Sequence, residues 1–199
     1  MILIGLTGSI AMGKSTVGAM FAELGAPVFD SDFVVHAFYS SPEASRVEAE
    51  FPGVFSGDAI DRRKLADYVL GDDSAMARLE AIVHPIVDAA RDSFVRKAAA
   101  GRARQVIVDS PLLLETGAAD SVDLVVVVSA PAPVQKARAL ARAGMTLKRF
   151  ESILSRQTPD QEKRRRAHYV VDTSGPLAAT RGQARDLLRC TAGMSGRSF

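Results

Sequence analysis

Short runs of apolar, often β-branched residues alternate along the chain with segments of helical periodicity. Three of these runs predict buried strands, at Ile2–Leu6, Gln105–Asp109 and Asp123–Val128. Two weaker runs predict further strands, at Pro27–Phe29 and Tyr169–Asp172. Apolar strands that alternate with helices are typical of a parallel sheet covered on both faces. The pattern therefore predicts an α/β fold built on a doubly wound, five-stranded parallel sheet.

The segments between the strands place apolar residues three or four positions apart, as amphipathic helices do. Residues 17–24 follow this spacing after the first strand, and residues 79–94 follow it over a longer stretch. Pro85 lies inside the longer segment, and because proline removes a backbone hydrogen bond, we expect it to kink that helix or to mark a boundary. Further helices are predicted over residues 33–39, 134–143, 147–156 and 177–188.

A segment bracketed by glycines links the first strand to the first helix. It reads Gly8-Ser9-Ile10-Ala11-Met12-Gly13-Lys14-Ser15, the spacing of a phosphate-binding loop. The glycines let successive N–H groups point at one anion, Lys14 adds positive charge at the β- and γ-phosphates, and Ser15 offers a hydroxyl to Mg²⁺. A chance glycine turn is disfavoured, because a strand precedes the motif and a helix follows it. The motif predicts a nucleotide site without separating a kinase from an ATPase or a GTPase.

Two acidic residues, Asp30 and Asp32, follow the second strand. In an open α/β sheet, ligands bind beyond the carboxyl ends of the strands. A carboxylate there can orient an attacking hydroxyl or accept its proton. Either residue can instead cap the helix that follows. The spacing is compatible with one acid capping that helix and the other acting in catalysis.

Composition and charge exclude several classes of protein. Hydrophobic residues make up 47% of the chain, charged residues 24%, and the net charge is +2, which is ordinary globular composition with no sign of a nucleic-acid or membrane partner. The one cysteine, Cys190, permits no internal disulfide and fits a reducing compartment. The longest apolar run, Leu124–Val128, is far shorter than the roughly 20 residues that span a bilayer. We expect a cytoplasmic protein.

Other charged residues each allow two interpretations. Arg138 and Arg142 lie four apart, so one helix face could present both to a phosphate or simply to solvent. Asp109, at the end of a strand, could face Mg²⁺ or be a plain loop acid. His84, in an apolar helix, is more typical of a packed residue than of a catalyst. The basic run Lys163–Arg166 is interpreted as a solvated helix end or a charged rim, since it lacks the interleaved aromatics of a nucleic-acid patch.

With the phosphate loop, several downstream stretches occur in a specific order between about residue 2 and residue 175. They are Asp30–Asp32, Asp61–Leu65, Leu79–Pro85, Asp109–Glu115, Gln135–Arg138 with Arg142, and Gln157–Asp160 with Lys163. This ordered set closely resembles the dephospho-coenzyme A (dephospho-CoA) kinase family of P-loop small-molecule kinases. The resemblance implies ATP- and Mg²⁺-dependent phosphorylation of the ribose 3′-hydroxyl of dephospho-CoA.

The resemblance also implies site residues and an organisation. The implied catalytic residues are Asp32, Lys14 and Arg142. The implied ATP-binding residues are Gly8, Ala11, Met12, Gly13, Lys14, Ser15, Thr16 and Arg138, with Ser15 on the metal. The implied acceptor-binding residues are Asp32, Arg63, His84, Leu113 and Glu115. We expect one P-loop kinase domain over residues 1–199, with a helical acceptor-binding segment at about 33–100, a lid at about 138–166, and a monomer or weak homo-oligomer.

The chain departs from the family pattern at a few positions. Ser9, Ala11 and Met12 stand in a loop that usually holds more glycine, and His168 and Thr173 differ near the last strand. Phosphate binding should survive, because the loop spacing requires only Gly8 and Gly13. The alternatives are another small-molecule kinase, acting on a nucleoside monophosphate or a sugar acid, or a nucleic-acid-stimulated ATPase. The lack of an Asn-Lys-x-Asp motif disfavours a GTPase.

Overall fold

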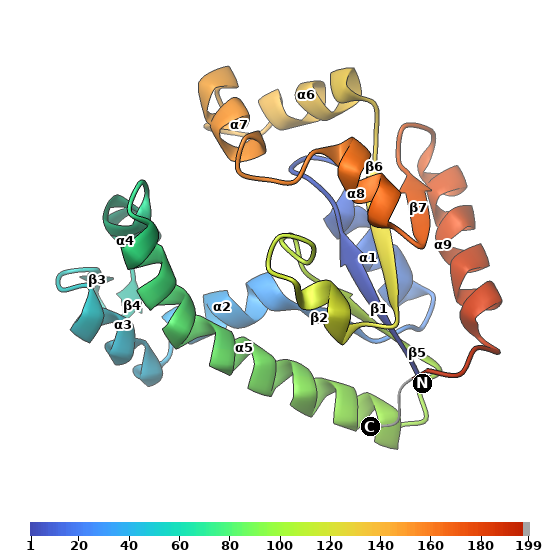
Figure 1. Ribbon diagram of the computed structural model, residues 1–199, viewed down its shortest axis with the longest axis horizontal. Helices are drawn as coiled ribbons and strands as arrows, with labels where there is room; N and C mark the ends of the chain where they lie inside the picture. Colours follow the sequence, from blue (N-terminus) through green and yellow to red (C-terminus); the bar gives the residue numbers. More distant parts are fainter. Residues whose placement is uncertain (197–199) are drawn as a thin grey trace. The chain divides into compact units, whose positions relative to one another are not determined.

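A computed structural model describes residues 1–196 (Figure 1). The chain divides into two compact units. The first unit comprises Met1–Phe29 and the chain from Val95 onward, and the second comprises Asp30–Phe94. None of the helices within residues 1–196 combines the length and the apolar character that crossing a bilayer requires.

The main sheet has five strands in the order β2-β5-β1-β6-β7. Their bounds are β1 (Ile2–Thr7), β2 (Val28–Asp30), β5 (Gln105–Asp109), β6 (Leu124–Ser129) and β7 (Tyr169–Asp172). β1 pairs in parallel with β5 and β6, and β6 pairs in parallel with β7. The predicted α/β fold with a five-stranded parallel sheet is confirmed.

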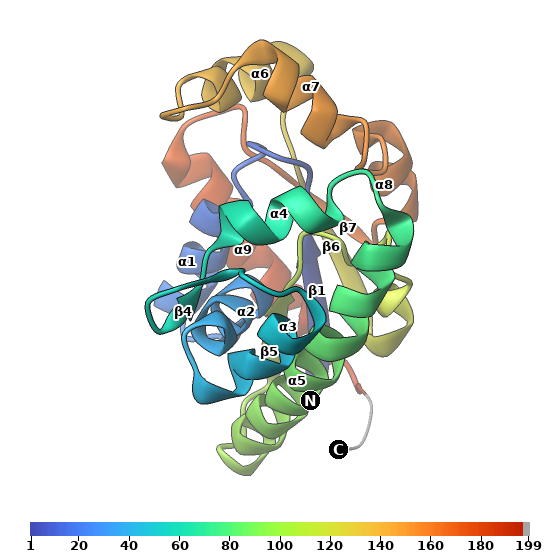
Figure 2. The same ribbon diagram turned by 90° about the vertical axis from the view of Figure 1, so that its left-hand side faces the viewer.

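Helices of the first unit cover both faces of this sheet. α1 (Lys14–Glu23) and α9 (Leu177–Thr191) contact one another and pack on one face, while α8 (Asp160–Arg166) packs on β6 from the other (Figure 1). α6 (Ala132–Leu140) follows the carboxyl end of β6, and α7 (Leu147–Leu154) lies beside it (Figure 2). These two short helices therefore stand at the edge of the sheet where its strands end.

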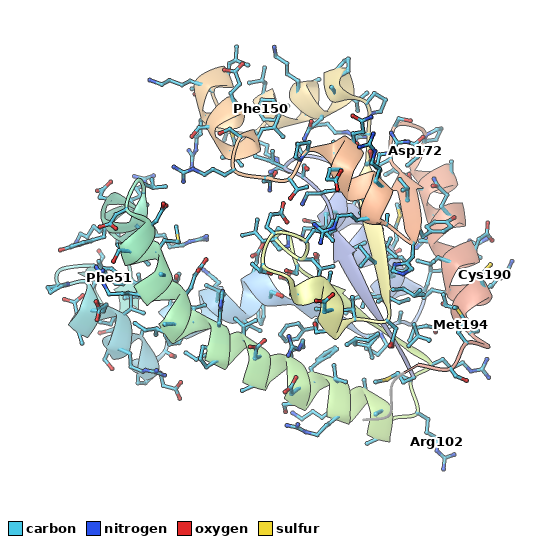
Figure 3. All side chains as sticks on the ribbon, in the orientation of Figure 1. Phe51, Arg102, Phe150, Asp172, Cys190 and Met194 are labelled. Carbon is cyan, nitrogen blue, oxygen red and sulfur yellow. The ribbon has the colours of Figure 1, made fainter. Side chains whose placement is uncertain are left out.

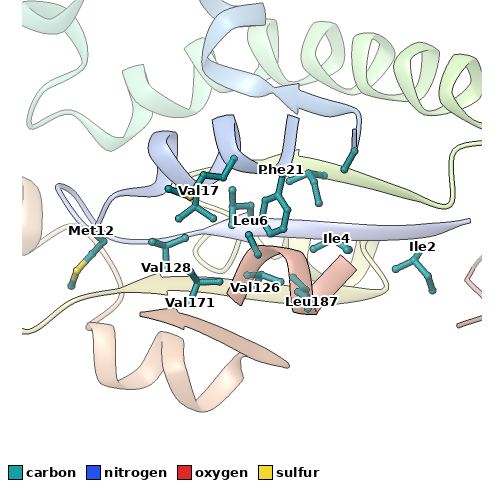
Figure 4. Close-up of a cluster of buried hydrophobic side chains, with 14 of the residues drawn as sticks. Ile2, Ile4, Leu6, Met12, Val17, Phe21, Val126, Val128, Val171 and Leu187 are labelled. Carbon is teal, nitrogen blue, oxygen red and sulfur yellow. The ribbon is translucent and has the colours of Figure 1, made fainter. Parts of the chain in front are cut away.

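The core of the first unit lies between the sheet and the α1/α9 layer (Figure 4). Leu6 on β1 and Phe21 on α1 are completely buried, as apolar strands and an amphipathic helix predict. On the opposite face, a Cβ added to Gly5 would collide with the side chains of Leu113 and Val122. The glycine in the central strand therefore lets the segment after β5 approach the sheet closely.

The second unit is mostly helical and has its own core. Its elements are α2 (Ser31–Tyr39), the 3₁₀ turn η1 (Pro42–Ala44), α3 (Ser45–Glu50), the hairpin β3 (Phe55–Ser56) and β4 (Ala59–Ile60), α4 (Arg62–Val69), and most of α5 (Asp73–Ala100). The large buried side chains of this core include Phe38, Phe51, Leu65 and Leu79. Phe51, at the end of α3, is 1% exposed (Figure 3).

Two features of these helices bear on the sequence predictions. α5 continues through Pro85, so of the two outcomes expected there, a kink or a boundary, the boundary is excluded. The periodicity that predicted residues 79–94 places Leu79 and Val83 in the core, and this packing supports the helix across the missing hydrogen bond. The helix α4 was not predicted, because it opens on Arg62-Arg63-Lys64 and buries only Leu65 and Val69.

Candidate active site

The phosphate loop connects β1 to α1, and two of its residues have backbone angles in the left-handed region. Gly13, the N-cap of α1, has φ 95°, and Ala11 has φ 61°. Gly8 is required for another reason: a Cβ there would lie 2.7 Å from the carbonyl oxygen of Val128 on β6. The loop thus combines a close approach to the sheet with the tight curl that turns backbone N–H groups toward an anion.

The loop is fixed to the ends of β6 and β7 through Met12, which is 2% exposed. Its sulfur accepts a hydrogen bond from the backbone N–H of Ala130 at 3.2 Å. Its carbonyl oxygen accepts one from the hydroxyl of Thr173 at 2.7 Å. Since these bonds come from neighbouring strand ends, the sheet itself sets the position of the loop.

Lys14 and Asp109 form an ion pair beneath the start of α1. Asp109 is the last residue of β5 and lies in register with Leu6 of β1, while Lys14 is the first residue of α1. The two side chains are 14% and 7% exposed. A Cβ on Gly18 would lie 3.5 Å from the Asp109 carboxylate, which places this acid against the first turns of the helix. Asp109 is therefore a partner of the loop lysine, and not a solvated loop acid.

A pocket of about 270 Å³ opens beside the loop. It is lined by Ala11, Gly13, Thr16, Arg138, Arg142, Thr173, Leu177 and Thr180. Five of these are predicted site residues, so the first unit brings much of the predicted nucleotide site together. Ser15, at the start of α1, is exposed, and the positive end of the α1 dipole lies at the same end of the helix.

The two arginines of this pocket differ in their surroundings. Arg138 donates to the hydroxyl of Thr173 at 2.9 Å and to its carbonyl oxygen at 2.6 Å. Arg142 is exposed and lies beyond the end of α6 at Leu140, so the predicted helix over 134–143 is too long by a few residues. Arg138 is held to the end of β7, whereas Arg142 lies on the segment that connects α6 to α7.

The second unit carries three further charged candidates, Asp32, Arg63 and His84. Asp30 is the N-cap of α2, and its carboxylate accepts a hydrogen bond from the N–H of Phe33 at 3.0 Å. Asp32 lies in the first turn of α2 and is exposed. Asp30 therefore caps the helix, and the Asp32 carboxylate is accessible to a ligand. Arg63 and His84 are also exposed. Lys14 belongs to the other unit, so a site shared by Lys14 and Asp32 stays a prediction.

Comparison with known proteins shows the family to which this chain belongs. A family model described as "Dephospho-CoA kinase" matches residues 2–179. A dephospho-CoA kinase of Rhizobium etli is 52% identical over 188 residues, which cover 94% of this chain and 93% of that protein. The chain belongs to the dephospho-CoA kinase family. Another small-molecule kinase or a nucleic-acid-stimulated ATPase is not favoured.

Solved structures agree with this fold. A protein from Thermus thermophilus has a TM-score of 0.84 and 32% identity, covering 95% of this chain and 96% of its own. A dephospho-CoA kinase from Campylobacter jejuni has a TM-score of 0.62 at 21% identity, over 95% of this chain and 96% of its own. Both similarities support the fold described above.

One ion pair of this dephospho-CoA kinase family member corrects an expectation about the basic run. Lys163 on α8 is fully buried and pairs with Glu115 at 2.8 Å, so it is not part of a solvated helix end. The Glu115 carboxylate also accepts a hydrogen bond from the N–H of Thr158 at 2.9 Å. Burial favours a higher pKa for Glu115, but the hydrogen bonds from Lys163 and Thr158 outweigh it and hold that pKa below its usual range.

The remaining predicted acceptor residue of the first unit is Leu113, which is 1% exposed and packs against the Gly5 backbone. Its side chain is part of the core, and its acceptor-binding role stays a prediction, as does that of Glu115. Sequence reasoning gave no role to Gln135 and Gln157, although both bond to the phosphate loop. Both lie in stretches of the family pattern, but no local signal relates a glutamine to a loop so distant in sequence.

Proposed function

We propose that this chain transfers the γ-phosphoryl group of ATP to the ribose 3′-hydroxyl of dephospho-CoA. The products are coenzyme A and ADP, so the reaction is the last step of coenzyme A biosynthesis. The observation that carries the proposal is an ordered phosphate loop within a chain that matches the dephospho-CoA kinase family over residues 2–179.

On the nucleotide side, the loop from Gly8 to Gly13 receives the phosphates on its backbone N–H groups. Lys14 exchanges the carboxylate of Asp109 for the β- and γ-phosphates and places its charge where negative charge develops. The Ser15 hydroxyl at the start of α1 and the Asp109 carboxylate at the end of β5 are the oxygen donors that suit Mg²⁺. When bound, that ion neutralises charge on the phosphate oxygens.

The segment from about 138 to 166 acts as a lid in this proposal. Arg142 lines the pocket, is exposed, and sits on the connection between α6 and α7. Closing of this segment brings the guanidinium of Arg142 onto the transferring phosphoryl group and excludes water, which limits wasteful hydrolysis of ATP. Arg138 stays at the nucleotide through its bonds to Thr173.

On the acceptor side, Asp32 accepts a hydrogen bond from the 3′-hydroxyl and aims its oxygen at the γ-phosphorus. Positioning of this kind supplies much of the catalysis in phosphoryl transfer. Arg63, His84, Leu113 and Glu115 are the further residues proposed for dephospho-CoA, within an acceptor-binding segment at about 33–100. We further propose a cytoplasmic monomer or weak homo-oligomer without a nucleic-acid partner.

An acceptor screen tests the proposal. The purified protein is incubated with ATP and Mg²⁺ together with dephospho-CoA, AMP or shikimate, and the products are weighed by mass spectrometry. We expect one added phosphate on dephospho-CoA alone, and no transfer by Lys14→Ala. Transfer to AMP or shikimate without transfer to dephospho-CoA would overturn the proposal, and so would ATP hydrolysis that only RNA or DNA stimulates.

A further inference from the structure

Both backbone polar groups of Ile10, in the phosphate loop, are bonded to glutamine side chains. The N–H of Ile10 donates to Oε1 of Gln157 at 2.9 Å. The carbonyl oxygen of Ile10 accepts from Nε2 of Gln135 at 2.8 Å. Gln135 is 4% exposed, so water competes little for this bond. The loop therefore takes its hydrogen bonds at Ile10 from outside the strand and helix that it connects.

The next residue explains why these bonds matter. Ala11 has φ 61° and is 5% exposed. A left-handed backbone is readily adopted by glycine but disfavoured for a residue with a Cβ. The φ angle of Ala11 sets the orientation of the peptide between Ile10 and Ala11, and the carbonyl of that peptide is the group that Gln135 holds. The glutamine bond therefore opposes relaxation of Ala11 out of its strained conformation.

The two glutamines flank α7: Gln135 lies just before the proposed lid begins, and Gln157 lies within it. Gln135 is in the first turns of α6, and Gln157 lies between α7 and α8. Residues between them also contact the loop: Phe150 of α7 (Figure 3), with Met145 and Leu154, packs in a small apolar cluster with Ile10 and Ala11. Movement of the segment between the glutamines therefore changes the packing contacts of Ile10 and Ala11.

Gln157 is itself fixed on its other side. The N–H of the next residue, Thr158, donates to Glu115, and Glu115 pairs with the buried Lys163 on α8. The hydroxyl of Ser129 at the end of β6 donates to Asp160 at 2.8 Å, which attaches the start of α8 to the sheet. Gln157 therefore bonds to Ile10 from a segment that is itself held in place. A residue that positions the loop needs such an anchor.

We infer that Gln135 and Gln157 are positioning residues: they clamp the Ile10 peptides and keep the phosphate loop in its anion-binding shape although alanine occupies its left-handed position. The inference rests on the proposed function only in taking this loop as the ATP site. The clamp also ties the shape of the loop to the segment between Gln135 and Gln157, which includes much of the proposed lid. A merely structural role would change stability alone, whereas positioning changes nucleotide affinity and turnover in the folded protein.

A charge-matched pair of variants tests the clamp. Gln157 accepts the hydrogen bond from the Ile10 N–H, so Gln157→Glu keeps that bond. Gln135 donates to the Ile10 carbonyl oxygen, so Gln135→Glu loses that bond and points a carboxylate at the carbonyl. Calorimetric titration with ADP should show about tenfold weaker binding for Gln135→Glu, and a change within about twofold for Gln157→Glu. Turnover should follow the same order. Ala11→Gly in the Gln135→Glu background should restore most of the ADP affinity, because glycine needs no clamp.

Equal effects of the two glutamate variants, or a Gln135→Glu defect that Ala11→Gly leaves unchanged, would overturn the inference. If Gln135→Glu does not fold, Gln135→Met replaces it, since methionine keeps the length and volume without the amide donor. ADP titration needs no acceptor, so the clamp can fail while wild-type protein still phosphorylates dephospho-CoA. Conversely, an inactive wild type that binds ADP with the expected variant order would refute only the proposed acceptor.

Discussion

The ammonium group of Lys14 is bonded to the carboxylate of Asp109, where α1 begins and β5 ends. The lysine of the phosphate loop thus has an acidic partner at the end of the neighbouring strand. Because both side chains are largely buried, the carboxylate offsets the cost of holding the lysine charge away from water. In the proposed mechanism, the phosphates of ATP take over that role, and Asp109 is left beside the proposed magnesium position.

Asp109→Asn separates these two roles of the carboxylate. The amide keeps a hydrogen-bond acceptor but loses the charge opposite Lys14, so the nucleotide-free protein should lose about 1–3 kcal/mol of unfolding free energy. Turnover should need more Mg²⁺, since one proposed oxygen donor has lost its charge. Urea unfolding and a magnesium titration measure the two effects. Asp120→Asn, at an exposed acid, is the control, and wild-type stability with wild-type magnesium dependence in Asp109→Asn would contradict this account.

Neighbouring acids at the start of α2 should give opposite results. Asp32→Asn should lower kcat by about 10²- to 10⁴-fold and leave ADP affinity unchanged, because the residue is proposed to act on the acceptor alone. Asp30→Ala should cost about 1 kcal/mol of stability through the lost cap, with a far smaller effect on kcat. Steady-state kinetics, ADP titration and thermal unfolding test the pair. Equal losses of kcat and ADP affinity in Asp32→Asn would count against its acceptor role.

Substitutions of the two pocket arginines should also have different effects on stability and turnover. Arg142 has no side-chain hydrogen bond or ion pair within residues 1–196, so Arg142→Ala should leave stability unchanged while turnover falls about 10³-fold. Arg138→Ala should instead lower the unfolding temperature and the nucleotide affinity, because it removes the bonds that hold α6 to Thr173 at the end of β7. Lys148→Ala, an exposed cation on α7, controls for loss of charge near the lid. A turnover defect in Arg142→Ala no larger than that of Lys148→Ala would remove Arg142 from the mechanism.

The pairing of Glu115 with Lys163 makes stability depend on pH. The folded-state pKa of Glu115 is lowered, so the pair stabilises the protein above the unfolded-state pKa, about 4.3, and that contribution is lost as the pH falls through the folded-state pKa. Glu115→Gln should therefore be less stable than wild type at neutral pH, and the difference should shrink in acid. Urea unfolding across this range checks it, with Glu151→Gln as an exposed control. A stability difference that does not change with pH would contradict the assignment.

The sequence allowed the sheet and the phosphate loop to be predicted because both are local patterns. β1, β5 and β6 are continuous apolar runs, and the loop spacing is a short motif between a strand and a helix. Asp30 and Asp32 were identified by their place after a strand, but assigning the cap to Asp30 needed the hydrogen bond to Phe33.

What could not be predicted depends on contacts between distant residues. Lys163 lies in a run of four basic residues that looks solvated, and its burial depends on Glu115, which lies far earlier in the chain. Likewise, nothing in the sequence around Gln135 or Gln157 indicates that both side chains reach Ile10. The hairpin β3–β4 has strands too short for an alternating pattern to be visible.

Tracing the transferred group itself tests the central claim most directly. The wild-type protein is incubated with Mg²⁺, dephospho-CoA and ATP whose γ-phosphoryl group carries heavy oxygen, and the product is examined by tandem mass spectrometry. The account predicts a labelled phosphate on the ribose 3′ position, and no labelled product from an acceptor that lacks the 3′-hydroxyl. Label found only in inorganic phosphate, or on another hydroxyl of the acceptor, would contradict it.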